Sequence, residues 1–370
     1  MMNDKIISLI IFFLLPTYLF AQDDAALKYA AGITGNDLRK HLTIIASAEM
    51  EGRETASPGQ KKAAAYIEDQ FKSIGLKHPS QINDYQQSYP LYKDTLLSSL
   101  LKIGKTRYEF GKDFIINAGR NLKEEIKSKE IIFAGYGIAD KKYDDYAGKN
   151  VTGKTVIFFS GEPKINGKSI SAGVSRNSIW STNRKMILAK QKGAVGALII
   201  LGDAIPKTTV DNIKKTTLNY PRPVTKENDR IANATITTKV AADILGITSF
   251  PNLSAKAKIG EALNTINLKA EVKLKLEYKK RRIHFSSTNV IGYVEGTDKK
   301  DEYVFLTGHY DHLGKRDGII YYGADDDGSG TVSVIEMAQA FAKAKAEGNG
   351  PRRTIVFMIV SGEEKGLWGS

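Results

Sequence analysis

The chain has 370 residues, 42% of them hydrophobic, which is enough apolar material for two domains. It contains no cysteine, so its stability cannot depend on disulfide bonds. Lys and Arg number 54 against 41 Asp and Glu, a formal net charge of +13 that could indicate binding to nucleic acid or to an anionic envelope surface. However, the basic residues are scattered apart from a cluster at 279–282, and no aromatic-rich nucleic-acid motif accompanies them. We therefore interpret the excess as surface charge and expect no nucleic-acid partner.

The first 21 residues have the pattern of a secretory signal peptide. One Lys lies near the start, residues 6–20 are largely apolar, and the small residue Ala21 precedes Gln22. The apolar stretch is short for a membrane anchor, and an uncleaved signal anchor is the alternative interpretation. We expect an exported protein, secreted or periplasmic, with no stable membrane anchor after the signal peptide is cleaved.

Residues 37–76 are predicted to form two helices around a polar turn. Ser57, Pro58 and Gln60 are typical of a capping box with Pro at the first helical position. Apolar side chains then recur at helical spacing until Gly75, at Ala63, Ile67, Phe71 and Ile74. The second helix should therefore bury one face in a core.

The character of the sequence changes from about residue 129. The predicted elements are strands at 131–133 and 156–159, a helix at 184–192 and a strand at 197–201. Further on, residues 272–278 alternate between apolar and charged side chains, which predicts a half-exposed strand, and residues 289–294 are predicted to form the next strand.

A first candidate metal loop follows the apolar run at 303–306, which predicts a buried strand. His309 and Asp311 would emerge at its carboxyl edge, where ligands bind in open α/β sheets. A neutral imidazole is a good zinc ligand, and a carboxylate two residues further on could hold its second nitrogen. We interpret His309 as a ligand and Asp311 as its support, although the pair alone also fits a structural histidine. His312 is interpreted as surface or local hydrogen bonding.

A second loop carries three adjacent carboxylates before a helix predicted at 331–346. Asp325, Asp326 and Asp327 repel one another unless a cation or hydrogen bonds offset their charge, and a carboxylate can bridge two metal ions. An exposed Asp-Gly turn that caps the helix is an equal alternative. An EF-hand is excluded because the acidic residues are contiguous.

A third loop follows residues 354–360, which are almost entirely strand-forming. Adjacent side chains at a strand end point in different directions, so Glu363 and Glu364 can have different roles. One could bind a metal while the other acts as general base. A Glu-Glu pair alone is usually solvated surface, but three such loops in succession, each after a strand, favour a metal-dependent hydrolase.

Together the three loops resemble the signatures of the co-catalytic zinc aminopeptidases, a family that includes aminopeptidase Y, glutamate carboxypeptidase, glutaminyl cyclase and the transferrin receptor. The segments that carry the resemblance are Gly-His-Tyr-Asp-His from 308, Gly-Ala-Asp-Asp-Asp-Gly-Ser-Gly from 323 and Ser-Gly-Glu-Glu from 361. The resemblance implies two Zn²⁺ ions, with His309 on one, Asp326 bridging both and Glu364 on the other. It also implies that Glu363 is the catalytic base and that Asp311 orients His309.

The resemblance further implies an α/β fold, a zinc-peptidase α/β sandwich around a mixed sheet, with an inserted mainly-β or α+β protease-associated domain. The expected organisation is a signal peptide at 1–21, peptidase segments at 22–128 and 263–370, and the insert at 129–262. The insert would be a lid, a docking surface or a passive spacer. Arg53, in a loop similar to the one that opens the peptidase domain in this family, is interpreted as structural, with a role near the substrate as the alternative.

The expected activity is that of an aminopeptidase acting on peptide substrates. A glutaminyl cyclase-like acyltransferase and a non-catalytic protein like the transferrin receptor are the alternatives. The family supplies an Asp and a His ligand after the Glu-Glu motif, and the sequence up to Ser370 has neither in a matching position. We therefore expect a truncated chain, an incomplete sheet and little activity from these 370 residues.

Overall fold

The computed structural model describes residues 24–117, 121–171, 179–214, 216–223 and 231–370. They form two compact units, one from residues up to Tyr89 together with Ser286–Ser370, the other from Pro90–Phe285. The signal peptide predicted at 1–21 lies outside the described residues. Among the described residues, no helix combines the length and apolar character needed to cross a membrane.

The second unit is wider than the insert predicted at 129–262. Its additional residues include parts of two long strands, β1 (Gln86–Ile103) and β13 (Lys269–Val294), which lie outside the predicted boundaries of the insert. Residues of β13 from Lys269 to Lys279 pair antiparallel with β4 (Lys123–Phe133), so this part of the strand belongs to the sheet of the second unit. The identity of this unit as a protease-associated domain stays a prediction.

The strand β13 also corrects the prediction of two separate strands at 272–278 and 289–294. The intervening basic residues stay extended because β13 lies next to β1, where Asp94 offsets their charge. Its carboxylate is 2.8 Å from Lys280 Nζ and accepts hydrogen bonds of 2.7 and 2.9 Å from the guanidinium of Arg282. One carboxylate thus offsets the charges of two basic residues on the same face of the strand.

In the first unit, three strands place the candidate loops at one edge of the sheet. The end of β13 pairs antiparallel with β17 (Arg353–Val360), and β17 pairs parallel with β14 (Lys299–His309). His309 lies opposite Val360, so the loops that follow β14 and β17 begin side by side. Both strands and their order agree with the sequence prediction, and the mixed α/β class with a mixed sheet is confirmed.

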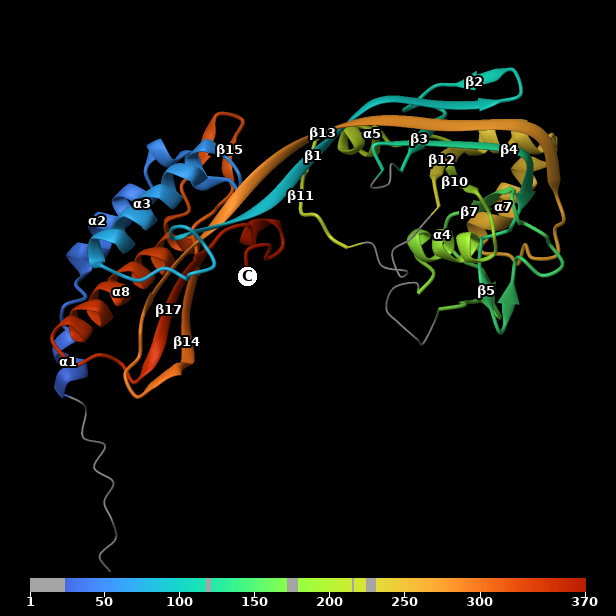
Figure 1. Ribbon diagram of the computed structural model, residues 1–370. Coiled ribbons are helices and arrows are strands. Elements are labelled where there is room, and N and C mark those ends of the chain that lie inside the picture. The colour runs from blue at the N-terminus through green and yellow to red at the C-terminus, as the bar shows by residue number, and fades with distance from the viewer. Residues whose placement is uncertain (1–23, 118–120, 172–178, 215, 224–230) are drawn as a thin grey trace, which may run out of the picture. The chain divides into compact units, whose positions relative to one another are not determined.

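The helices of the first unit lie on one side of β14 and β17 (Figure 1). They are α1 (Asp24–Ala30), α2 (Gly35–Ile45), α3 (Pro58–Ile74) and α8 (Gly330–Ala346), with a short 3-10 segment η1 (Ala48–Arg53) between α2 and α3. The predicted N-cap is confirmed, because Ser57 Oγ accepts from Gln60 N and the helix ends at Gly75 in the left-handed region. The reciprocal half of the predicted capping box is not formed, because Ser57 N donates to the main-chain oxygen of Glu54 and the Gln60 side chain donates to the Tyr310 hydroxyl. Ile67 and Phe71 of α3 pack in one core with Phe357 of β17.

The predicted burial of residues 303–306 is wrong. Tyr303 is 60% exposed, Val304 39% and Phe305 57%. Within the described part of the chain, β14 pairs only with β17, so one of its edges is open, and the helices cover one face of the sheet. The apolar run therefore identified the strand correctly but not its surroundings.

The second unit contains four parallel strands, and helices lie in the sequence between the last three of them. The strands are β4, β7 (Thr155–Phe159), β10 (Gly196–Gly202) and β12 (Asn233–Thr237), and β3 (Phe114–Ile116) closes the sheet antiparallel to β12. The helices are α4 (Thr182–Gln191), α5 (Lys207–Lys214), α6 (Thr238–Leu245) and α7 (Phe250–Ile259). The predicted elements at 156–159, 184–192 and 197–201 correspond to β7, α4 and β10.

Short elements complete the described chain. They are β2 (Thr106–Tyr108), β5 (Ala139–Asp140), β6 (Tyr143–Asp144), β8 (Lys164–Ile165), β9 (Lys168–Ser169), β11 (Leu218–Asn219), β15 (Gly314–Arg316), β16 (Ile319–Tyr321), and the irregular turns η3 (Ala324–Ser329) and η4 (Glu363–Lys365).

Candidate metal centre

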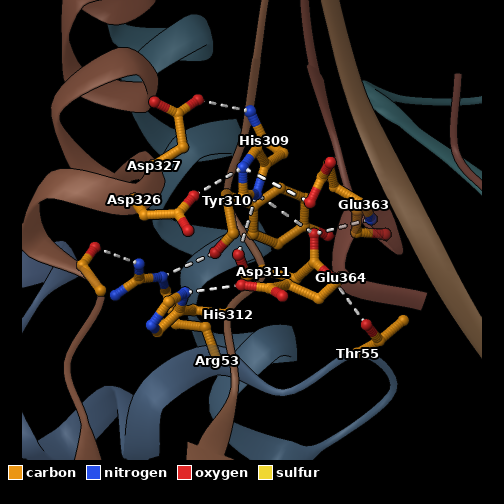
Figure 2. Close-up of polar contacts among 12 residues, drawn as sticks. Arg53, Thr55, His309, Tyr310, Asp311, His312, Asp326, Asp327, Glu363 and Glu364 are labelled. Carbon is orange, nitrogen blue, oxygen red and sulfur yellow. Dashed lines mark hydrogen bonds and ion pairs between the residues drawn. The ribbon is translucent and has the colours of Figure 1, made fainter. Parts of the chain in front are cut away.

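The three predicted loops meet at the carboxyl edge of β14 and β17. His309 ends β14, η3 with the three aspartates leads into α8, and η4 with Glu363 and Glu364 follows β17. Figure 2 shows the side chains of His309, Asp326, Glu363 and Glu364 turned toward a common region. The structure thus brings together the residues for which the sequence predicts metal binding and general base catalysis.

His309 is the centre of the first group of side chains. Its Nε2 lies 3.2 Å from Asp326 Oδ1 and 3.8 Å from Glu363 Oε2, while its Nδ1 is 3.1 Å from the main-chain oxygen of Asp311. Burial disfavours the charged imidazole, but the close main-chain oxygen and the carboxylate charge of Asp311, together with the charge of Asp327, outweigh it and raise the pKa of His309 to about 9. This position therefore attracts a cation.

Asp326 also faces a second group of side chains. Ligand atoms of His312, Asp326 and Glu364 all lie within 4.8 Å of one another. The Asp326 side chain is 68% exposed, so it is open to solvent between His309 on one side and Glu364 on the other. This arrangement agrees with the predicted bridging position, although the bridging role itself stays a prediction.

Asp311 is completely buried beneath the site. Its Oδ2 accepts a 2.6 Å hydrogen bond from Thr55 Oγ1, and its Oδ1 accepts from the main-chain N of Glu363 at 3.3 Å. The distance from Asp311 Oδ1 to His309 Nδ1 is 3.7 Å, longer than a hydrogen bond. Asp311 thus contacts His309 through its main-chain oxygen and holds the Glu363 loop with its carboxylate.

The carboxylate of Asp327 accepts main-chain hydrogen bonds, which account for this member of the acidic run without a metal ion. Its Oδ2 accepts from His309 N at 2.9 Å and its Oδ1 accepts from Gly330 N at 3.0 Å. A helix cap and a metal-binding loop were the two alternatives for the acidic run, and different residues fit each of them. Asp327 caps the start of α8, whereas Asp326 faces the candidate site.

Arg53 is a supporting residue whose role the sequence left open. It is 0% exposed and donates to the main-chain oxygens of Tyr310, Ile45, Tyr322 and Gly323 at 2.6 to 2.8 Å. Burial lowers the pKa of its guanidinium to about 10, opposed by the charges of Asp311 and Asp327. The structural interpretation of Arg53 fits these contacts, and they place it under two of the three loops.

His312 differs from its sequence interpretation. It is 9% exposed and therefore not a surface residue, and its Nδ1 lies 2.9 Å from Glu364 Oε1. The sequence could not reveal this position, because it depends on the turn that follows β14. A signal was present in the second histidine of the Gly-His-Tyr-Asp-His segment, directly after Asp311, the carboxylate predicted to support His309.

Comparison with known proteins shows which family the residues at this edge of the sheet resemble. The sequence model of peptidase family M28 matches residues 289–370, which contain all three loops. Residues 289–370, called the M28 segment below, are thus similar to this family.

Relatives of the M28 segment carry peptidase names. Over 88 residues the chain is 36% identical to a probable zinc metalloprotease of Leptosphaeria maculans, covering 22% of this chain and 19% of that protein. Over 97 residues it is 38% identical to a probable glutamate carboxypeptidase of Arabidopsis thaliana, covering 26% and 13%. The matches thus span less than a fifth of the length of these relatives.

Solved structures were also compared with the whole chain. An aminopeptidase from Aneurinibacillus sp. strain AM-1 is 20% identical, with a TM-score of 0.42, and the match covers 92% of this chain and 66% of that one. A zinc aminopeptidase from Bacillus subtilis is 17% identical, with a TM-score of 0.36 and coverage of 90% and 63%.

The side chains of the M28 segment fit divalent zinc. Imidazole nitrogens and carboxylate oxygens are ligands that zinc accepts. The ligand atoms of His312, Asp326 and Glu364 lie close enough together to share one ion. Among the described residues, His312 Nδ1 is a buried polar atom that has no hydrogen-bond partner. The clustered carboxylates would repel one another without a shared cation, and zinc would offset that repulsion.

Proposed function

We propose that the chain is a zinc-dependent exopeptidase that releases amino-terminal residues from peptides. The observation that carries the proposal is the position of Asp326, which lies 3.2 Å from His309 and within 4.8 Å of a ligand atom of Glu364, with the Glu363 carboxylate also beside His309. A carboxylate shared by two ligand groups is suited to two metal ions, and a neighbouring free carboxylate is suited to proton transfer.

In this proposal His309 and Asp326 would hold one Zn²⁺ ion, and Asp326 and Glu364 would hold the other. When bound, zinc polarises a carbonyl and lowers the pKa of water. Glu363 accepts the proton of the attacking water and passes it to the leaving amine. Its side chain is 38% exposed, so both water and substrate can reach it, and Asp311 fixes its main chain from below.

The Glu363→Gln substitution tests this assignment. General bases contribute about 10²- to 10⁴-fold to rate, so we expect a loss of that size in hydrolysis of leucine p-nitroanilide, with bound zinc unchanged. The matched control is Asp325→Asn, which alters an exposed carboxylate two residues after Gly323 and should keep both properties. A Glu363→Gln chain that hydrolyses the substrate at the unsubstituted rate would show that another group is the base.

Substrate comparisons separate the exopeptidase from the alternatives. An aminopeptidase should cleave the free leucyl anilide and not its N-acetylated form, and a chelator should abolish the reaction. Cyclisation of glutaminyl peptides without anilide hydrolysis would favour an acyltransferase, and zinc binding without either reaction would favour a non-catalytic protein. Each rate is compared with that of the unsubstituted chain.

We further propose that the protein is exported, to the periplasm or out of the cell, as its first 21 residues suggest. Cell fractionation and amino-terminal sequencing of the mature chain test this proposal. A mature protein that begins at Met1 and stays in the cytosol would refute it.

A further inference from the structure

His312 combines burial with an unsatisfied nitrogen beside a predicted metal ligand. The residue is 9% exposed, and its Nδ1 is without a hydrogen-bond partner among the described residues. The atom lies 2.9 Å from Glu364 Oε1, but this contact lacks the geometry of a hydrogen bond. A buried polar atom without a partner costs about 1–3 kcal/mol, so a residue held in this state requires an explanation.

The surroundings of His312 fix both its main chain and its ring. Its main-chain N donates to the main-chain oxygen of Arg53 at 3.2 Å. The ring packs against Gly323, where an added Cβ would lie 2.5 Å from the imidazole Cγ. Gly323 begins the loop that carries Asp326, and the ring is therefore held between this loop and the loop of Glu364.

We propose that His312 is a direct ligand of the metal ion held by Asp326 and Glu364. Among the residues of this chain, the sequence interpretation assigned that ion the two carboxylates, and the structure adds a nitrogen within 4.8 Å of both. This inference rests on the proposed function only in assuming that the centre binds zinc.

The distances and the donor types support a metal ion between these atoms. Zinc binds imidazole nitrogen and carboxylate oxygen at about 2.0–2.2 Å, which places neighbouring ligand atoms around a tetrahedral ion about 3.3 Å apart. His312 Nδ1 lies 2.9 Å from Glu364 Oε1, and the ligand atoms of the group all lie within 4.8 Å of one another, so these distances lie on either side of that value. Small side-chain adjustments would therefore suffice to bind an ion. A cation between the imidazole nitrogen and the carboxylate oxygen would attract both atoms.

The test uses Co²⁺ as the probe, with the whole chain in each arm. Unsubstituted protein, His312→Ala, His309→Ala and the control His284→Ala, which alters an exposed histidine of the second unit, are titrated with Co²⁺ by calorimetry. The number of coordinated imidazoles is counted from the paramagnetically shifted ring N–H signals in NMR spectra. Circular dichroism checks that each variant folds.

We expect two shifted imidazoles in the unsubstituted protein and one in His312→Ala. Loss of a direct ligand should weaken one Co²⁺ site more than about 100-fold, whereas loss of a group that only orients a ligand costs about 10- to 100-fold. His284→Ala should match the unsubstituted protein in both measurements.

The outcomes separate this inference from the proposed function. One shifted imidazole in the unsubstituted protein, lost in His309→Ala and retained in His312→Ala, would overturn the inference and leave the metal centre in place. Absence of Co²⁺ binding by the unsubstituted protein would overturn both. If His312→Ala does not fold, the imidazole count in the unsubstituted protein still decides, because it requires no variant.

Discussion

At the scale of single residues, Arg53 shows how a buried cation can serve a site that it does not contact. Its guanidinium donates to the main-chain oxygens of Tyr310, Tyr322 and Gly323, which lie in the loops that carry His309 and Asp326. Planar guanidinium groups can serve several acceptors at once, and an ammonium group at the end of a flexible stem cannot reproduce that geometry. The positions of the ligand loops therefore depend on the shape of this side chain as well as on its charge.

We predict that Arg53→Lys lowers the free energy of unfolding by about 2–4 kcal/mol, because at least one or two charged hydrogen bonds are lost. Zinc affinity should fall about 10- to 100-fold, as for other groups that orient ligands. Urea denaturation and zinc titration measure the two effects, and Arg39→Lys, an exposed substitution in α2, is the control. Unchanged zinc affinity in a destabilised Arg53→Lys chain would restrict the residue to a purely structural role.

Lys185 in α4 is a buried charge of the second unit. It is 1% exposed and its ammonium donates to the main-chain oxygen of Gly161. Burial lowers its pKa to about 8, opposed by the charges of Asp145 and Glu162, while an unfolded lysine titrates near 10.5. The unfolded chain thus binds more protons between about pH 8 and 10.5, so the contribution of Lys185 to stability rises with pH in that window and is lost as pH falls through 8.

The Lys185→Met substitution should consequently raise the free energy of unfolding at pH 7, by about 1–3 kcal/mol, because it removes a buried charge of similar length. The gain should shrink as pH rises toward 10.5. Denaturant unfolding at pH 7, 8.5 and 10 measures it, with Lys190→Met on the exposed side of the same helix as control. A gain that does not vary with pH would mean that the Lys185 charge is not the cause.

At the scale of elements, the sequence predicts the helices and strands that are marked by residues close to one another in the chain. The helix α3 was predictable because Ser57 and Gly75 mark its ends and its apolar residues recur at the helical period. The strands β14 and β17 were predictable from their apolar runs. The length of β13 was not, since its basic middle is stabilised by Asp94, which lies more than 180 residues away in the sequence.

The same contrast holds in the candidate site. His309, Asp326, Glu363 and Glu364 were predictable because each follows a strand or precedes a helix in a recognisable motif. The burial of His312 was not predictable from the sequence, because it depends on packing against Gly323. The roles of Asp327 and Asp326 could not be separated either, because the difference lies in which main-chain amides their side chains reach.

The strand β14 carries an exposed apolar surface on an open edge. Tyr303 and Phe305 share one face by the alternation of strand side chains, and both are more than half exposed. Open apolar edges promote strand pairing between molecules, and a lysine there opposes it. We predict that the chain associates in a concentration-dependent way and that Phe305→Lys weakens the association.

Light scattering during size-exclusion chromatography measures this prediction. The control is Leu97→Lys, which alters a leucine of the second unit that is 59% exposed. A Phe305→Lys chain that associates as strongly as the Leu97→Lys chain would place the contact elsewhere.

At the scale of the whole molecule, zinc should stabilise the first unit across both of its sequence segments. The proposed ligands all lie after Ser286, but contacts from Arg53, from Thr55 to Asp311, and between Glu54 and Lys365 at 3.0 Å connect them with the segment before Tyr89. A ligand at about 100 times its Kd stabilises the native state by about 2.7 kcal/mol. Zinc should thus raise hydrogen-exchange protection around residues 45–60 as well as at 309–312 and 361–365.

Hydrogen exchange followed by mass spectrometry, with zinc and then with excess chelator, measures this effect. The internal control is the second unit, where β7, β10 and β12 have a hydrophobic core of their own and should exchange at the same rate in both conditions. Protection confined to the residues after Ser286 would show that the Arg53 and Thr55 contacts do not transmit the stabilisation. Equal protection of both units would instead indicate that zinc acts outside the proposed centre, since the described ligand group lies in the first unit alone.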